Sequence, residues 1–256
     1  MRLDIYLTEQ GLVSSRTEAK GFITSSSVKV DGKVITKPSF EVSDGSDIEI
    51  DKSTKKYVGR GGLKLESAIF AFGISVSGKK AIDIGASSGG FTDCLLQNGA
   101  ESVIAIDSGT NQLVDSLRRD PRVISIENYN ARYMKSSDLP YVPDLCVMDV
   151  SFISATYIMP SIRNVLAPNA DFICLIKPQF EVGRSGLGKG GIVKSDKLRK
   201  EAVDKVVDFA KHIGFSLIST MESATPSLRR YTCTSRDNIS LIKSDSILVF
   251  CSICGV

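Results

Sequence analysis

The stretch that decides the fold of this chain reads Asp83-Ile84-Gly85-Ala86-Ser87-Ser88-Gly89-Gly90-Phe91-Thr92. It follows an apolar run at 80–82 and leads into a helix-like run at 91–96. A strand, a glycine turn and a helix in this order bring a helix N-terminus and bare backbone close to a nucleotide. The sequence therefore predicts a nucleoside cofactor site, with contacts from Asp83, Gly85, Ala86, Ser87, Gly89, Gly90 and Phe91.

The type of cofactor follows from counting along this turn. A dinucleotide fingerprint needs a third glycine at position 87, where Ser87 stands, and this argues against a pyrophosphate. A P-loop needs Lys after Gly90, where Phe91 stands. The remaining candidate is a nucleoside without a pyrophosphate, and S-adenosylmethionine fits. A tight connection without a ligand is the structural alternative.

Apolar strand patterns alternate with helical patterns over the larger part of the chain, 63–226. The expected strands are 81–84, 103–106, 123–126, 145–148, 172–176 and 215–220, and the expected helices are 65–72, 92–98, 112–118, 155–166 and 198–212. This alternation predicts an α/β fold with a doubly wound, Rossmann-like sheet. Polar residues stand at or just after the strand ends, where such sheets bind ligands: Asp83, Asp107, Asn130, Asp149 and Lys177.

Two of these positions predict cofactor contacts, and two others, with a lysine at the start of the helix expected at 65–72, predict chemistry. Asp107 is placed to bind ribose hydroxyls, and Asn130 is a further expected cofactor contact. Methyl transfer to a hydroxyl needs an aligned oxygen and a group that accepts its proton. A cluster of Lys64, Asp149 and Lys177 can supply both. Each of these residues, taken singly, is also explained as a surface charge.

The first part of the chain, 1–51, has the pattern of a small α+β module. Helical spacing follows Ser14-Ser15, and Asp31-Gly32 between alternating segments is a hairpin signal. The segment 52–62 that follows is basic and reads as a linker, either simply solvated or a track for a phosphate backbone. The candidate RNA contacts are Arg2, Arg16, Lys20, Lys55, Lys56 and Arg60.

The order of helix, hairpin and strand resembles the RNA-binding module of ribosomal protein S4, pseudouridine synthases and heat-shock RNA binders. The matching positions include Arg2-Leu3-Asp4, Ser15-Arg16, Ala19, Ile23, Val28, Val30, Gly32, Lys37-Pro38 and Val42. In that family the helix and hairpin present Arg and Lys to structured RNA. Ser26-Ser27 departs from the glycine-basic pair that usually precedes the first hairpin strand.

The whole set of motifs resembles the TlyA (hemolysin A) family. The motifs are 57–66, 83–94, Asp149-Val150-Ser151-Phe152-Ile153-Ser154, Lys177-Pro178-Gln179-Phe180-Glu181 and Gly188-Lys189-Gly190-Gly191. The resemblance implies an S-adenosylmethionine-dependent 2′-O-methyltransferase of ribosomal RNA cytidines, with an FtsJ-type domain. It also implies a Lys-Asp-Lys-Glu tetrad, which falls here on Lys64, Asp149 and Lys177.

The tail, 227–256, departs from that family pattern. Where the family runs to Gly-Asn-Ile-Glu, this chain has Asp237-Asn238-Ile239-Ser240, so the fourth tetrad residue has no counterpart. One codon assignment for 229–237, read one nucleotide later, gives Gly-Asp-Ile-His-Ala-Pro-Gln-Gly. We therefore hypothesise a frameshift near Ser227, which leaves 246–250 as the candidate last strand. The missing Glu favours the alternative of a non-catalytic RNA- or ribosome-binding protein.

The composition and the cysteine pattern restrict the classes of protein to which this chain could belong. The chain has 256 residues and a net charge of +3, with neither a long apolar run nor a signal-peptide pattern. A cytoplasmic protein is expected, and a membrane-lytic role finds no support. Cys251 and Cys254 form a lone C-x-x-C without a second pair, so no metal site is predicted. The oligomeric state is not indicated.

Overall fold

The computed structural model describes residues 1–13, 15–24, 26–43, 45–51, 56–188, 191–193, 195–222 and 238–243. The chain divides into two compact units, Met1–Lys56 and Tyr57–Val256. No helix within the described residues is long and apolar enough to cross a bilayer.

The first unit packs two helices on a small antiparallel sheet. The helices are α1 (Leu3–Glu9) and α2 (Arg16–Thr24), and the sheet has the order β2 (Lys33–Val34), β1 (Val28–Val30), β3 (Ile48–Ile50). Asp31 and Gly32 both have positive φ, as a tight hairpin turn with right-handed strand twist requires. Ser15 begins α2 by accepting a hydrogen bond from the backbone N–H of Glu18. The predicted α+β module is confirmed.

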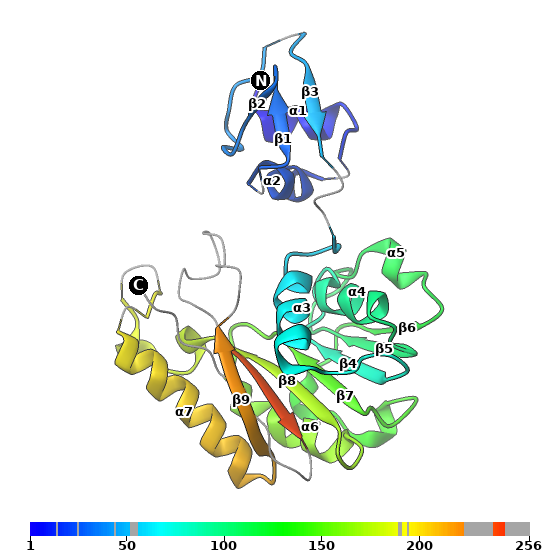
Figure 1. The fold of residues 1–256 in the computed structure, drawn as a ribbon, viewed down its shortest axis with the longest axis vertical. Helices are drawn as coiled ribbons and strands as arrows, with labels where there is room; N and C mark the ends of the chain where they lie inside the picture. The colour runs from blue at the N-terminus through cyan, green and yellow to red at the C-terminus, as the bar shows by residue number, and fades with distance from the viewer. Residues whose placement is uncertain are drawn as a thin grey trace. The chain divides into compact units, whose positions relative to one another are not determined.

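The second unit is built on a seven-stranded sheet (Figure 1). The strands are β4 (Lys80–Ile84), β5 (Ser102–Ile106), β6 (Val123–Ile126), β7 (Leu145–Met148), β8 (Asp171–Ile176), β9 (Ser216–Glu222) and β10 (Asn238–Lys243). They lie in the order β6-β5-β4-β7-β8-β10-β9. The first five are parallel, and β10 runs antiparallel to both β8 and β9.

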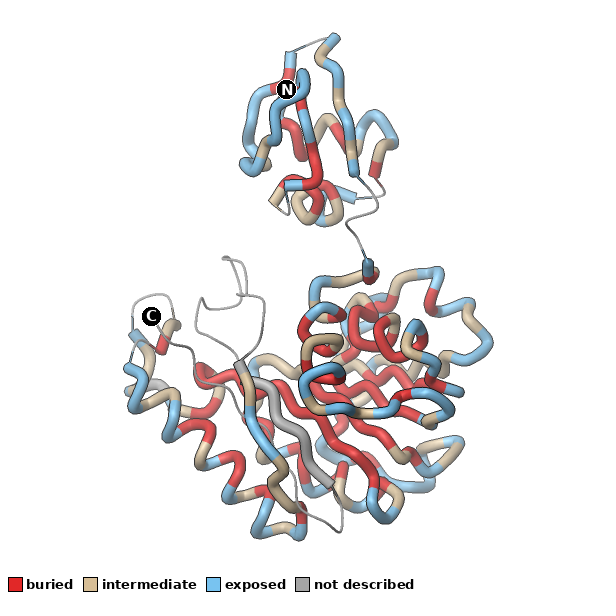
Figure 2. Tube along the Cα trace, in the orientation of Figure 1, coloured by how far each residue is buried: buried red, intermediate tan, exposed pale blue. Residues whose placement is uncertain are grey.

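Helices cover both faces of this sheet, so the unit has three layers. One core combines strand side chains with α3 (Gly61–Phe72), α4 (Gly90–Gln97) and α5 (Asp115–Arg118). The other combines the alternate strand residues with α6 (Met159–Val165) and α7 (Asp196–His212). The central strands are buried on both sides (Figure 2). The predicted α/β fold with a Rossmann-like sheet is therefore confirmed.

Several elements differ in detail from the sequence-based expectation. The expected helix at 112–118 is helical only over α5, because residues 109–114 form a loop. The expected helix at 155–166 is a 3-10 turn, η4 (Ala155–Tyr157), followed by α6, which has Pro in its first turn. Residues 57–62, expected in the linker, pack within the second unit, where Tyr57 is buried and hydrogen-bonded to Glu66.

The last strand was misplaced by the sequence analysis. The final described strand is β10, whose backbone pairs Asn238 with Ile176 of β8. The expectation that 246–250 held the only candidate strand was therefore wrong, because it overlooked the apolar–polar alternation within 238–243. Residues 246–250 themselves, and the proposed frameshift region at 227–237, lie outside the described residues.

Candidate active site

The glycine turn joins β4 to α4 through backbone that only small residues tolerate. Gly85 has φ +85°, and a Cβ built there would lie 2.7 Å from the carbonyl oxygen of Asp149. Gly89 has φ +97°, and the backbone N–H groups of Gly85 and Ala86 both donate to the carbonyl oxygen of Ile106. The turn therefore lies directly against the ends of the neighbouring strands β5 and β7.

The side chains of Phe91 and Ala86 point into the protein, so only their backbones are left as the predicted cofactor contacts. Both side chains are buried, and both belong to the hydrophobic core beneath α3 and α4. Phe91 lies in the first turn of α4, where backbone N–H groups have no partner within the helix. Ser87 has φ +49° and is exposed, so it lies on the solvent side of the turn.

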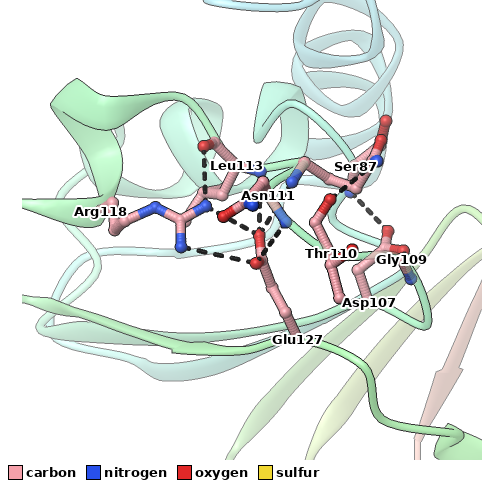
Figure 3. Close-up of polar contacts among 9 residues, drawn as sticks. Ser87, Asp107, Gly109, Thr110, Asn111, Leu113, Arg118 and Glu127 are labelled. Atoms are coloured by element: carbon pink, nitrogen blue, oxygen red, sulfur yellow. Dashed lines mark hydrogen bonds and ion pairs between the residues drawn. The ribbon is translucent and has the colours of Figure 1, made fainter.

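Asp107 at the end of β5 links the glycine turn to the next loop (Figure 3). Its Oδ2 accepts the backbone N–H of Ser87 at 2.8 Å, and its Oδ1 accepts that of Gly109 at 2.7 Å. A carboxylate offers about four acceptor positions, so two remain for ribose hydroxyls. Asn130 is exposed, and its side-chain oxygen is engaged in capping η2 (Ala131–Tyr133) through the N–H of Arg132.

Asp83 is fully buried beneath the turn. Its Oδ2 accepts a 2.7 Å hydrogen bond from Thr92 Oγ1, whereas its buried Oδ1 has no hydrogen-bond partner among the described residues. Burial raises the pKa of Asp83 to about 7, although the bond from Thr92 acts in the opposite direction. Buried oxygens normally have a hydrogen-bond partner, so the unpartnered Oδ1 of Asp83 beside the glycine turn fits a site where a polar or cationic ligand supplies that partner.

Asp149 and Lys177 meet at the ends of β7 and β8. Nζ of Lys177 lies 2.5 Å from Oδ1 of Asp149 and donates a 2.8 Å hydrogen bond to Oγ of Ser151. The Lys177 side chain is 8% exposed and that of Asp149 is 23% exposed, so the pair is largely desolvated yet reachable. The backbone N–H of Asp149 donates to the carbonyl oxygen of Ile84, which fixes the pair beside the glycine turn.

Lys64 lies in the first turn of α3 and is buried. This turn approaches the same pair, because a Cβ built at Gly61 would lie 4.0 Å from Oδ2 of Asp149. The structure thus brings the start of α3 and the Asp149–Lys177 pair to one edge of the sheet. A cation on α3, a carboxylate and a second cation can orient a hydroxyl group and accept its proton.

Three residues of this edge were not assigned a role from the sequence. Ser151 fixes Lys177, as described above. Phe152 is 79% exposed, has φ +65° and places its ring 5.3 Å from that of Phe180. Glu181 is buried and accepts hydrogen bonds from Ser154 Oγ at 2.6 Å and Ala155 N at 2.8 Å. Their motifs were noticed, but their roles depend on contacts more than 20 residues apart in sequence.

In the first unit, three predicted RNA contacts converge on one buried carboxylate. Asp4 is fully buried and accepts hydrogen bonds from Arg2 at 2.9 Å and Arg16 at 3.0 Å, while Nζ of Lys20 lies 3.8 Å away. Burial opposes ionisation, but these hydrogen bonds outweigh it and hold the pKa of Asp4 below its usual range. The three cations outnumber the one carboxylate and remain 43–51% exposed. The role of Asp4 was missed.

The remaining predicted RNA residues are Lys55, Lys56 and Arg60, which are close together in sequence. Lys56 is exposed at the end of the first unit, and Arg60 is exposed at the start of α3 in the second. Lys55 lies outside the described residues, as do Lys189 and Gly190 of the glycine-rich motif. Among the residues that the structure describes, no group of three or more His, Cys, Asp or Glu could hold a metal ion.

The architecture and these motifs match known families. The FtsJ-like methyltransferase family matches residues 57–230, and the S4 domain matches residues 1–48. Hemolysin A of Brachyspira hyodysenteriae is 46% identical over 213 residues, which is 81% of this chain and 88% of that protein. The 16S/23S rRNA (cytidine-2′-O)-methyltransferase TlyA of Mycobacterium tuberculosis is 39% identical over 226 residues, covering 88% of this chain and 84% of that protein.

Comparison with solved structures also finds a hemolysin. A hemolysin candidate from Streptococcus thermophilus is 37% identical, with a TM-score of 0.76, over 97% of this chain and 90% of that one. These likenesses extend over both units and are far above the level at which only the fold is shared. The chain belongs to the TlyA (hemolysin A) family of FtsJ-like methyltransferases with an N-terminal S4 domain.

Proposed function

We propose that this protein transfers a methyl group from S-adenosylmethionine to the 2′-hydroxyl of a cytidine in ribosomal RNA, in the cytoplasm. The observation that carries the proposal is the ion pair between Lys177 and Asp149, set directly against the glycine turn at Gly85. A proton-accepting pair beside a nucleoside site is what hydroxyl methylation requires. A non-catalytic RNA-binding protein would not need such a pair.

The cofactor would be held by the glycine turn and Asp107. Gly85, Gly89 and Gly90 let the turn pack closely against Asp149, Leu113 and Gly59, which fixes its shape, and Asp107 keeps two acceptor positions for the ribose. S-adenosylmethionine supplies a methyl group on a sulfonium sulfur, which is electrophilic without further activation. The orphaned Oδ1 of Asp83 adds a negative or polar group beneath the turn, where it complements a cationic ligand.

The chain's own contribution to the reaction is alignment and proton acceptance. Asp149 and Ser151 fix Nζ of Lys177 in one position, and Lys64 lies in the first turn of α3, the turn that begins beside Asp149. In its amine form, Lys177 Nζ would accept the proton of the 2′-hydroxyl while the methyl group passes from the sulfonium sulfur to the oxygen, with the neutral thioether S-adenosylhomocysteine as the leaving group. Alignment of the oxygen with the methyl carbon accounts for a further part of the rate.

The target nucleotide must leave its stack to reach this pair. Phe152 is three residues beyond Asp149 and presents an exposed ring supported by Phe180. Its left-handed backbone is strained for a bulky residue, and strain of this kind concentrates at functional sites. The ring is suited to stacking on the extruded base, because stacking on aromatics is the usual way to hold an unstacked base.

RNA is the partner that the first unit supports. Arg2, Arg16 and Lys20 form a cluster with excess positive charge, held in place by buried Asp4. A fixed group of cations binds a phosphate backbone at a lower entropic cost than freely moving side chains. The names of the M. tuberculosis relative and of the Campylobacter jejuni 23S rRNA (cytidine-2′-O)-methyltransferase, 34% identical over 246 residues, support ribosomal RNA and cytidine.

The test uses the full-length protein with purified 30S and 50S subunits from a strain that lacks this modification. Methyl-labelled S-adenosylmethionine is added, and label incorporated into RNA is counted over time. We expect stoichiometric incorporation into one or both subunits with wild type and none with Lys177→Met. No incorporation into either subunit, from protein that binds the cofactor in calorimetry, would overturn the proposed substrate.

A further inference from the structure

A second carboxylate, outside the expected cofactor contacts, organises the loop beside the glycine turn (Figure 3). Glu127 directly follows β6, and its side chain is 14% exposed. It accepts three successive backbone N–H groups, from Asn111 at 2.7 Å, Gln112 at 3.0 Å and Leu113 at 3.2 Å. Three converging amides form an anion-binding nest, which here is filled by the protein's own carboxylate.

Arg118 completes the enclosure of Glu127. Its Nη2 and Nη1 donate to the two carboxylate oxygens at 3.0 Å and 3.4 Å. Glu127 therefore receives five hydrogen bonds, and a carboxylate offers only about four good acceptor positions. Asp107, on the neighbouring strand β5, receives only two. Asp107 thus retains capacity for a ligand, whereas Glu127 is saturated and acts on the protein itself.

The loop held by Glu127 supports the glycine turn. Leu113 and Leu117 pack against Gly89 so closely that a Cβ at Gly89 would lie 2.7 Å and 2.3 Å from their Cδ1 atoms. The N–H of Val114 also donates to the carbonyl oxygen of Ser88 at 3.4 Å. A shift of the loop at Leu113 is therefore transmitted to Gly89, which is the N-cap residue of α4.

We propose that Glu127 is a positioning residue for the cofactor, which fixes the loop at 111–113 and thereby the glycine turn in its binding conformation. The inference rests on the proposed function, since it assumes that the turn binds S-adenosylmethionine. Asp107 and Glu127 hold the two ends of one loop, and of the two only Asp107 has acceptor positions left for a nucleoside. Removing Glu127 therefore weakens cofactor binding without touching the cofactor or the Asp149–Lys177 pair.

The experiment compares full-length wild type with Glu127→Gln, Glu127→Asp and a matched control, Asp120→Asn. Asp120 also accepts one backbone N–H and two guanidinium nitrogens of Arg122, and its substitution removes the same charge. Calorimetric titration with S-adenosylmethionine gives the dissociation constant. Hydrogen–deuterium exchange of the protein without cofactor reports the amides of 111–113, and steady-state kinetics separate KM for the cofactor from kcat.

We expect Glu127→Gln to raise the dissociation constant and the cofactor KM about tenfold or more, because several charge-assisted hydrogen bonds are lost together. The kcat at saturating cofactor should stay within about twofold, and exchange should accelerate at 111–113 but not at 145–149. Glu127→Asp should recover part of the affinity because it keeps the charge. Asp120→Asn should match wild type in all three measurements.

The outcomes separate this inference from the proposed function. Wild type that fails to bind S-adenosylmethionine would overturn both. Wild type that binds, with Glu127→Gln binding equally well or losing kcat instead of affinity, would overturn the positioning role alone. Faster exchange across the whole second unit would show that Glu127 is merely a stabilising residue, and would also overturn it.

Discussion

Lys177 Nζ lies 2.5 Å from Asp149 Oδ1 at the ends of two adjacent parallel strands, β7 and β8. The carbonyl oxygen of the same Asp149 faces Gly85, so one residue contacts both the lysine and the glycine turn. The proposed base and the proposed nucleoside site are therefore joined through the backbone of one residue. Substitutions on the two sides of Asp149 should accordingly separate catalysis from cofactor binding.

Lys177→Met and Asp149→Asn should each reduce methyl transfer at least about 100-fold, because a positioned proton acceptor contributes this much or more. Cofactor affinity should change little, since neither side chain belongs to the glycine turn. Label incorporation into subunits and calorimetry measure the two quantities. Lys211→Met, which removes an exposed lysine of α7, serves as the control. Equal loss of affinity and of turnover would contradict the assigned division of roles.

Gly85→Ala should abolish cofactor binding and lower the Tm. The new Cβ would sit 2.7 Å from a backbone oxygen that cannot move away without displacing Asp149. Gly78→Ala is the matched control, because Gly78 has φ +74° but no atom within 4 Å of a Cβ. It carries the backbone strain alone, about 1–2 kcal/mol, and should bind normally. Loss of binding in both variants would point to strain rather than to the close approach.

Arg16→Gln combined with Lys20→Gln should weaken RNA binding and reduce the slope of log affinity against log salt by about two. Cofactor affinity should remain unchanged, because these residues belong to the first unit. Lys29→Gln in the same unit is the control, since Lys29 is already paired with Glu49 at 2.8 Å. Binding of a ribosomal RNA fragment is measured from 50 to 300 mM salt. An unchanged slope in the double variant would show that α2 does not face the RNA.

Asp83 should make the stability of the protein fall as pH rises from about 4 to about 7. Its pKa is raised to about 7, so in this window the native state holds a proton that the unfolded chain has released. Stability gained from this group is complete at low pH and absent above about pH 7. Asp83→Asn removes the slope that Asp83 contributes. Urea unfolding between pH 5 and 8 measures it.

The control for this pH dependence is Asp208→Asn, which changes an exposed carboxylate on α7. Its curve of unfolding free energy against pH should run parallel to that of wild type. The stability of Asp83→Asn relative to wild type should instead increase as the pH rises towards 7, because only wild type loses stability there. Parallel curves for wild type and Asp83→Asn would contradict a raised pKa.

The parts of this site that could be predicted from the sequence all depend on patterns among residues that are close together in the chain. The glycine turn and the polar residues Asp107, Asp149 and Lys177 directly follow apolar runs, and strand ends of a parallel sheet lie at one edge. Strand periodicity and glycine spacing are local signals, so they place these residues without knowledge of the packing. The Asp31-Gly32 hairpin was predictable for the same reason.

The parts that were missed depend on contacts between distant segments. Glu127 acquires its role only when the loop at 111–113 folds back on it, and Asp4 only when Arg16 approaches from the next helix. In the sequence, Asp4 is simply an acidic residue of a helix, and Glu127 is an acidic residue after a strand. Strand β10 was overlooked because its short alternation lies within a tail that departs from the family pattern.

The central claim, methyl transfer to a ribose hydroxyl of cytidine, is tested most directly by the identity of the modified nucleoside. Ribosomal RNA from unmodified subunits, treated with wild type and S-adenosylmethionine, is digested to nucleosides and measured by mass spectrometry. The account predicts 2′-O-methylcytidine, with its methyl group on the sugar fragment, and its absence after treatment with Lys177→Met. A methyl group on the base fragment, or the same product from Lys177→Met, would contradict it.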